Sequence, residues 1–245
     1  MKRLTHTLAL LLAGVLLHPI GTAHAASLGA EGYRENFDSM GLLGVTPPDG
    51  WSLWIGEAGS SRSSWTERIS ANGPGHCVAN MRRSRENLIA SNAPYAPSHV
   101  GYNAAFAVNQ TKDRVLATSP TVFSGMAWQL ELSNSSGSAI EALSLSYDTR
   151  RFTSAAHDNE LPGYQLFISL DGRFWNAVEA LNPDLNSVPN TVGVTTIKQA
   201  RVDLPSRWAA GATLLLRWVD DNAEQSSPDQ IIGLNNVEVQ VLSKP

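Results

Sequence analysis

The chain has 245 residues, of which 42% are hydrophobic and 16% are charged, and its formal net charge at pH 7 is −4. A mildly acidic chain lacks the basic surface that nucleic-acid binding requires, so we expect no nucleic-acid partner. The one basic cluster, formed by Arg82, Arg83 and Arg85, is expected to be a solvated edge. Cys77 is the only cysteine, so an internal disulfide is excluded and the core must hold the fold.

Residues 1–25 have the features of a secretory signal peptide. Two basic residues come first, an apolar run follows at 8–17, and an A-x-A cleavage pattern ends at Ala25. This pattern predicts a secreted or periplasmic protein. The apolar run is too short to span a bilayer comfortably, so no membrane anchor is expected after cleavage. The remaining chain, 26–245, carries a net charge of −6, and its length fits a single domain.

Alternating apolar and polar residues predict β-strands through most of this domain. The apolar faces, in chain order, are Met126, Trp128, Leu130 and Leu132; Leu143, Leu145 and Tyr147; Tyr164, Leu166, Ile168 and Leu170; and Val237, Val239 and Val241. Asp171-Gly172 is a strong hairpin signal. No segment is a convincing amphipathic helix, and residues 78–90 are the most helix-like. Many short strands joined by Gly, Pro, Asn and Ser turns predict an all-β fold, a jelly-roll β-sandwich of two mainly antiparallel sheets.

A series of short motifs gives the chain a family resemblance. In order, these are Glu35-Asn36-Phe37-Asp38, Pro48-Asp49-Gly50-Trp51, Asp113-Arg114-Val115-Leu116, Ser169-Leu170-Asp171-Gly172 with Trp175, Leu216-Arg217-Trp218, and Gly233-Leu234-Asn235-Asn236-Val237. The chain resembles the jelly-roll domain of secreted bacterial proteins, which is similar in outline to concanavalin-like and carbohydrate-binding modules. The resemblance covers residues 33–242. It implies two sandwiched sheets whose first and last strands are adjacent, but it does not imply one activity.

The same resemblance makes a structural calcium ion a candidate cofactor, although no cofactor is firmly predicted. Similar domains end in an Ile-Asp-Asp-Val strand whose Asp can help to hold calcium beside the first strand. This chain has Asn235-Asn236 instead, which keeps oxygen ligands but removes the charges that give affinity. The candidate metal ligands are therefore Glu35, Asp38 and Asn236. The alternative is a seam between the first and last strands that holds by strand pairing and packing without calcium.

Seven tryptophans are the best indication of a ligand. Sugars stack on exposed aromatic faces while polar groups at the rim bind their hydroxyls. Trp51, Trp54 and Trp65 lie in or beside the Gly- and Ser-rich segment 44–64, so they are the candidate ligand-binding residues. The alternative is that they cap an edge of the sandwich. The tryptophans within predicted strands are expected in the core: Trp128, Trp175 and Trp218.

Enzyme signatures are mostly absent, since neither G-x-S-x-G nor H-E-x-x-H occurs. The best candidate acid–base group is His157 and Asp158 with Glu160, and the acidic stretch 220–229 is a second candidate. Both also fit solvated loops. The sequence therefore predicts an exported, non-catalytic module that binds a glycan or a cell-envelope component. The alternatives are a secreted hydrolase acting on polysaccharide and a purely structural secreted protein.

Overall fold

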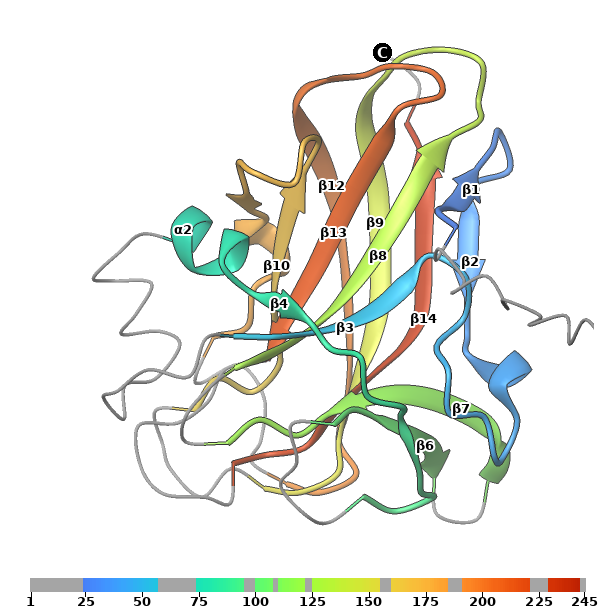
Figure 1. Cartoon of the computed structure of the whole chain (residues 1–245), viewed down its shortest axis with the longest axis vertical. Helices are drawn as coiled ribbons and strands as arrows, with labels where there is room; N and C mark the ends of the chain where they lie inside the picture. Colours follow the sequence, from blue (N-terminus) through green and yellow to red (C-terminus); the bar gives the residue numbers. More distant parts are fainter. Residues whose placement is uncertain are drawn as a thin grey trace, which may run out of the picture.

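The computed structural model describes residues 24–56, 74–94, 100–107, 110–121, 125–154, 160–184, 191–220 and 229–242. Strands dominate these segments and form two mainly antiparallel sheets that pack face to face (Figure 1). The predicted all-β sandwich is therefore confirmed. Residues 1–23 of the predicted signal peptide lie outside the described residues.

The first sheet has seven strands in the order β11-β10-β13-β8-β3-β4, with β1 paired in parallel to β8. Its strands are β1 (Ala26–Leu28), β3 (Trp51–Ile55), β4 (Arg82–Arg83), β8 (Met126–Asn134), β10 (Tyr164–Ser169), β11 (Asn176–Ala177) and β13 (Thr213–Asp220). The predicted inner face of β8 is confirmed, because all four of its apolar residues from Met126 to Leu132 are fully buried. The hairpin predicted at Asp171-Gly172 joins β10 to β11.

The second sheet has seven strands in the order β12-β9-β14-β7-β6-β5, with β2 paired to β14. Its strands are β2 (Tyr33–Glu35), β5 (Ile89–Ala90), β6 (Tyr102–Ala107), β7 (Gln110–Thr118), β9 (Ile140–Arg151), β12 (Thr195–Trp208) and β14 (Ile232–Val241). Strand β2 runs antiparallel to β14, with Glu35 opposite Val237 and Arg34 opposite Glu238. The two segments near opposite ends of the chain that were predicted to meet, β2 and β14, are therefore adjacent.

The core between the sheets is centred on aromatic rings. The Trp51 and Trp218 rings stack with their centroids 5.3 Å apart, and Tyr147 meets Trp218 edge-on at 5.8 Å. Phe37 packs edge-on against Trp51 at 5.0 Å. Because Phe37 directly follows β2 and Trp51 begins β3, this cluster fixes the N-terminal segment to both sheets.

A second apolar cluster lies on the outer face of the first sheet. It contains Val78, Met81, Phe167, Trp175 and Val219, all of them buried. Its helix is α2 (Pro74–Ala79), whereas the sequence indicated no convincing helix and pointed most nearly to residues 78–90. Two short 3₁₀ helices complete the fold: η1 (Asp38–Met40) and η2 (Glu179–Leu181).

Candidate functional site

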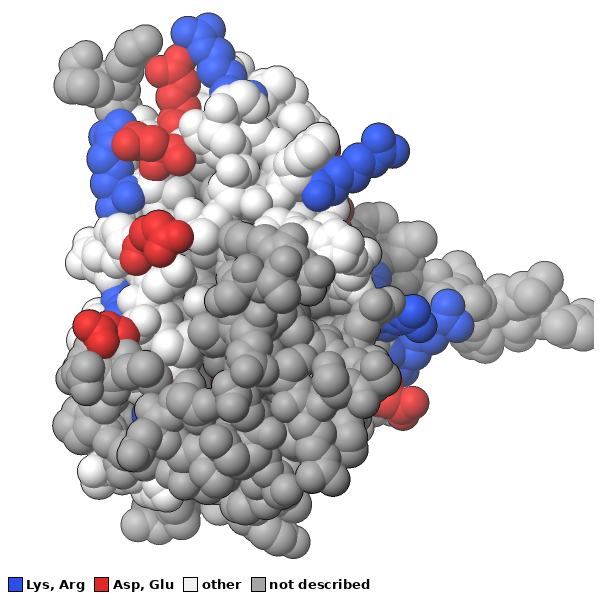
Figure 2. Space-filling view, turned by 90° about the vertical axis from the view of Figure 1, so that its left-hand side faces the viewer, with Lys and Arg blue, Asp and Glu red and all other residues white. Residues whose placement is uncertain are grey.

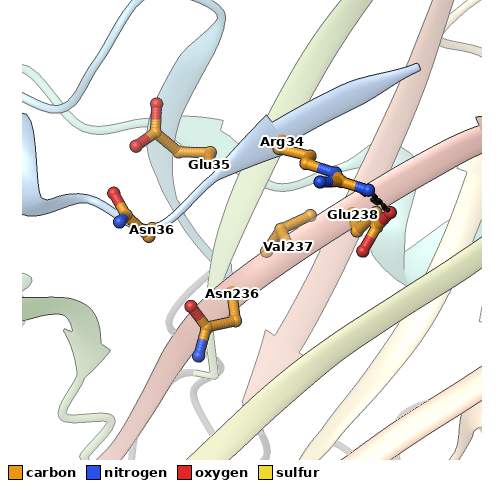
Figure 3. Close-up of a pocket in the computed structure, with 6 residues that line it drawn as sticks. All are labelled: Arg34, Glu35, Asn36, Asn236, Val237 and Glu238. Atoms are coloured by element: carbon orange, nitrogen blue, oxygen red, sulfur yellow. Dashed lines mark hydrogen bonds and ion pairs between the residues drawn. The ribbon is translucent and has the colours of Figure 1, made fainter. Parts of the chain in front are cut away.

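A pocket of about 400 Å³ lies at the seam between β2 and β14 (Figure 3). We call it the seam pocket, and its lining residues are Arg34, Glu35, Asn36, Asn236, Val237 and Glu238. All of them except the valine carry a polar or charged side chain. The volume lies within the range typical of small-molecule sites.

Strand geometry explains where these side chains lie: Arg34 and Glu238 point to one side of the seam, whereas Glu35 points away from them (Figure 3). The pairing of β14 with β9 shifts between Asn235 and Glu238, and Asn236 adopts a left-handed backbone with φ of 48°. Asparagine tolerates this conformation better than most residues, and a bulge re-aims the neighbouring side chains. Val237 is 1% exposed and points inward, whereas Asn236 and Glu238 reach the surface. On β2, Arg34 lies directly opposite Glu238.

Charge in the seam pocket is partly compensated. The Nε and Nη2 atoms of Arg34 donate to Oε1 of Glu238 at 3.0 and 2.7 Å. Glu35 accepts the backbone N–H of Phe37 at 2.7 Å. Burial raises the pKa of Glu35, the hydrogen bond from Phe37 opposes this rise, and the nearby Asp38 carboxylate adds to it. The pocket therefore presents one guanidinium and two carboxylates, of which only the Glu238 carboxylate is bonded to the guanidinium.

Asparagine amides hold aspartates around the seam pocket. Each donates from Nδ2: Asn36 to Asp38 at 3.0 Å, Asn235 to Asp113 at 3.1 Å, and Asn236 to Asp148 at 2.6 Å. The Oδ1 atoms of Asn36 and Asn235 accept backbone N–H groups. These bonds orient the amides at the rim of the pocket.

The predicted calcium ligands are only partly brought together. Glu35 and Asn236 line the seam pocket, but Asp38 lies in η1, where its Oδ1 accepts the backbone N–H of Arg114 at 2.8 Å. Across the described segments, no group of three or more His, Cys, Asp or Glu residues is placed to hold a metal ion. Calcium at this seam stays a prediction.

Trp51 does not offer a sugar-binding face, so the expectation that it is exposed is wrong. It is 2% exposed, and its Nε1 donates to the Tyr33 hydroxyl at 2.7 Å. The physical reason is that Trp51 begins β3 and faces the interior, where Trp218 stacks on it. The sequence had placed it in or beside the Gly- and Ser-rich segment 44–64 rather than in a strand.

Trp54 is half-buried on the opposite face of β3. The guanidinium carbon of Arg217 lies 3.7 Å from its ring centroid, so one face of the indole is covered. Residues three apart on a strand point to opposite sides, and Trp51 and Trp54 therefore cannot form one stacking platform. The third candidate, Trp65, lies outside the described residues.

The candidate acid–base residues are buried where the structure describes them. Glu160 is 3% exposed and accepts the Gln230 N–H at 2.5 Å, and Asp220 is fully buried at the end of β13. His157 and Asp158 lie outside the described residues, as does most of the acidic stretch after Asp220. Glu160 and Asp220 are thus buried inside one end of the sandwich.

On the face shown in Figure 2, acidic and basic side chains lie close together in the upper part of the molecule, and further basic side chains project at its right-hand margin. In the described part of the chain, the ion pairs of Arg201 with Asp203 and of Arg207 with Glu141 bring opposite charges into contact. None of the helices in the described segments is long and apolar enough to cross a membrane.

Replacing Glu35 with glutamine is expected to make stability less dependent on pH. The folded state raises the pKa of Glu35, so its contribution is most favourable below the unfolded pKa and is lost as the pH rises through the folded pKa. Glutamine removes this charge and can still accept the Phe37 N–H. We expect Glu35→Gln to have a higher Tm than wild type at pH 7 and the same Tm below about pH 4.

Thermal denaturation across this pH range measures the effect. Glu31→Gln, in an exposed turn, is the control and should follow the wild type throughout. A Tm difference between Glu35→Gln and wild type that is constant with pH would contradict the electrostatic explanation.

No protein-family model matches the chain, and no curated protein matches it. Solved structures similar to it include carbohydrate-binding modules. One is the CBM22-1 xylan-binding domain from Paenibacillus barcinonensis, with 10% identity and a TM-score of 0.30, covering 54% of this chain and 75% of that one. A cleaved adhesin domain of Lys-gingipain from Porphyromonas gingivalis has 14% identity and a TM-score of 0.37, covering 86% and 98%. The enzymatically active domain of a bacteriophage CBA120 tailspike protein has 12% identity and a TM-score of 0.36, covering 79% of this chain but only 19% of the tailspike chain.

Proposed function

We propose that this protein is an exported, non-catalytic module that binds a glycan, either free or as part of a cell-envelope component, in the seam pocket. The observation that carries the proposal is that five polar or charged residues line one pocket of about 400 Å³: Arg34, Glu35, Asn36, Asn236 and Glu238. Sugars present neighbouring hydroxyls that both donate and accept hydrogen bonds. Carboxylates accept these bonds, guanidinium groups donate them, and amides do both.

The hydrogen bonding of the pocket lining favours binding. Its residues lie on two hydrogen-bonded strands or directly beside them, and the Asn36 and Asn236 amides are already fixed by aspartates. A site ordered before the ligand arrives loses less conformational entropy on binding. Both carboxylates of the lining are already engaged, Glu238 by Arg34 and Glu35 by the Phe37 N–H, which favours binding over catalysis.

Removing the Arg34–Glu238 pair tests the proposal. The purified protein is screened on a glycan array and by polysaccharide pull-down, and the affinity for the best ligand is then measured by calorimetry. We expect Arg34→Ala/Glu238→Ala to weaken binding at least about tenfold, because charged hydrogen bonds to a ligand are lost. Arg34 is 72% exposed in its side chain, so the change in folding stability should stay within about 1 kcal/mol.

Arg207→Ala/Glu141→Ala is the matched control. This pair has a similar geometry, with an N–O distance of 2.7 Å and side-chain exposures of 71% and 43%. It should bind the glycan like wild type. The proposal fails if wild type binds no glycan, or if both double variants bind it equally well.

A further inference from the structure

An apolar tip projects from the margin of the sandwich. Its residues are exposed although they are large and apolar: Leu42 at 49%, Leu43 at 85%, Val45 at 39% and Ile89 at 41%. They lie together because the Leu88 N–H donates to the Val45 carbonyl at 2.8 Å. The segment that follows η1 lies at the outer margin of the molecule (Figure 1). Single exposed leucines need no explanation, but a cluster of this kind marks a contact surface.

The fold holds this tip in place from beneath. The fully buried Asn103 donates from Nδ2 to the carbonyls of Gly41 and Gly44, both at 2.9 Å. Arg114, also fully buried, anchors Asn103 by donating to its Oδ1 at 2.8 Å and to its carbonyl at 2.7 Å. A side chain at Gly44 would overlap the Met40 carbonyl, so only glycine fits this tight turn. The leucines between the two glycines are therefore kept outside the core.

A basic segment, residues 82–85, is linked to the apolar tip through a pocket that Arg83 shares with the residues after the tip. Arg82 and Arg83 form the edge strand β4, and they are exposed, as is Arg85. Arg83 and Glu86 line a pocket of about 280 Å³ together with residues 46–49, which directly follow the tip and include Asp49. The segment 82–86 carries three arginines and one glutamate in a chain that is acidic overall.

We propose that the apolar tip docks onto an anionic lipid surface, with the arginines at 82, 83 and 85 contacting the lipid headgroups. An apolar insertion and a basic patch are each weak membrane signals, and the two together give stable peripheral binding. A lipid surface accepts a projecting leucine pair without a complementary pocket, whereas a protein partner would need one. The positive charge of the patch fits the negative surface potential of anionic lipids.

Vesicle co-sedimentation tests this docking with protein purified after export. The probes are phosphatidylcholine vesicles with and without one quarter phosphatidylglycerol. Wild type should bind the anionic vesicles more tightly than the neutral ones. Leu42→Ser/Leu43→Ser should weaken binding at least about tenfold, because the inserted apolar area is lost. Arg82→Ala/Arg83→Ala/Arg85→Ala should remove the preference for anionic vesicles.

Phe174→Ser and Ile197→Ser are the controls, since these residues are 77% and 74% exposed away from the tip. Both should bind vesicles like wild type, and unchanged Tm values should show that every variant folds. Failure of wild type to bind anionic vesicles would overturn the proposal, as would full binding by Leu42→Ser/Leu43→Ser. Light scattering tests a different role for the tip. If wild type forms oligomers and does not bind vesicles, and Leu42→Ser/Leu43→Ser is monomeric, the tip serves self-association instead.

Discussion

Replacing Trp218 with alanine is expected to lower the free energy of unfolding by about 3 to 5 kcal/mol. Trp218 is fully buried at the centre of the sandwich, where it stacks on Trp51 and meets the edge of Tyr147. Alanine would remove the ring and leave a cavity between two sheets whose backbones are fixed by strand pairing. Such a cavity collapses poorly, so the transfer and cavity terms add.

Urea denaturation followed by far-UV circular dichroism measures this loss. Trp218→Phe keeps part of the ring volume and should lose less than alanine does. Phe174→Ala, at a position that is 77% exposed, is the control and should stay within about 0.5 kcal/mol of wild type. A loss below about 1 kcal/mol for Trp218→Ala would show that the aromatic cluster does not hold the sandwich together.

Trp51 belongs to the same aromatic cluster as Trp218, so substituting it does not test glycan binding. Its ring stacks on Trp218 and is 2% exposed, so Trp51→Ala would act through the core. Loss of glycan binding in that variant would report unfolding rather than a lost sugar contact. The seam variants at Arg34 and Glu238 avoid this problem, because they change a surface ion pair whose side chains are 72% and 31% exposed.

Strand alternation predicted the inner faces of the sandwich well. Residues such as Leu130, Leu145 and Leu166 are fully buried, because period-two patterns over long strands depend little on the partner strand. Strand β3 was missed because it has only five residues, and they show little alternation of apolar and polar side chains. Its structure depends on its pairing with β8, which is distant in the sequence. Helix α2 has six residues, which is too short for a helical period to be recognised in the sequence.

The seam pocket could be predicted only in part. The family resemblance placed the first strand beside the last, and two of its residues, Glu35 and Asn236, do line the pocket. Arg34 and Glu238 were missed, although opposite charges on two strands expected to meet were a usable signal. Their contact depends on cross-strand register, which the shift in β14 sets and local sequence does not show.

The sequence position of Arg217 suggests a solvent-exposed side chain, but the structure buries it. It alternates with the inward-facing Leu216 and Trp218 and would be expected in solvent, yet it is 3% exposed. Its guanidinium carbon lies 3.7 Å from the Trp54 ring centroid and 4.4 Å from that of Trp175. Burial lowers the pKa of Arg217, which reflects the cost of holding this cation away from water.

The hydrogen bonds of Arg217 join α2 to the first sheet. Its Nε donates to Oε1 of Gln129 at 2.7 Å, and its Nη1 donates to the Val78 carbonyl. Arg217→Ala would leave both acceptors without this donor and open a gap between Trp54 and Trp175. We expect it to lower the free energy of unfolding by about 3 kcal/mol or more, from unsatisfied polar groups, lost cation–π contact and a cavity.

Two further variants separate these causes. Arg217→Met fills the gap between the indoles and removes the buried charge, so it should lose less than Arg217→Ala. Arg217→Lys keeps the charge but loses the planar stack and the fork of donors, so it should be destabilised as well. Arg207→Ala, at a side chain that is 71% exposed, is the control and should be close to wild type. If Arg217→Met is as unstable as Arg217→Ala, the loss of stability comes from the unsatisfied acceptors. If Arg217→Ala is as stable as wild type, α2 is held by its apolar contacts alone.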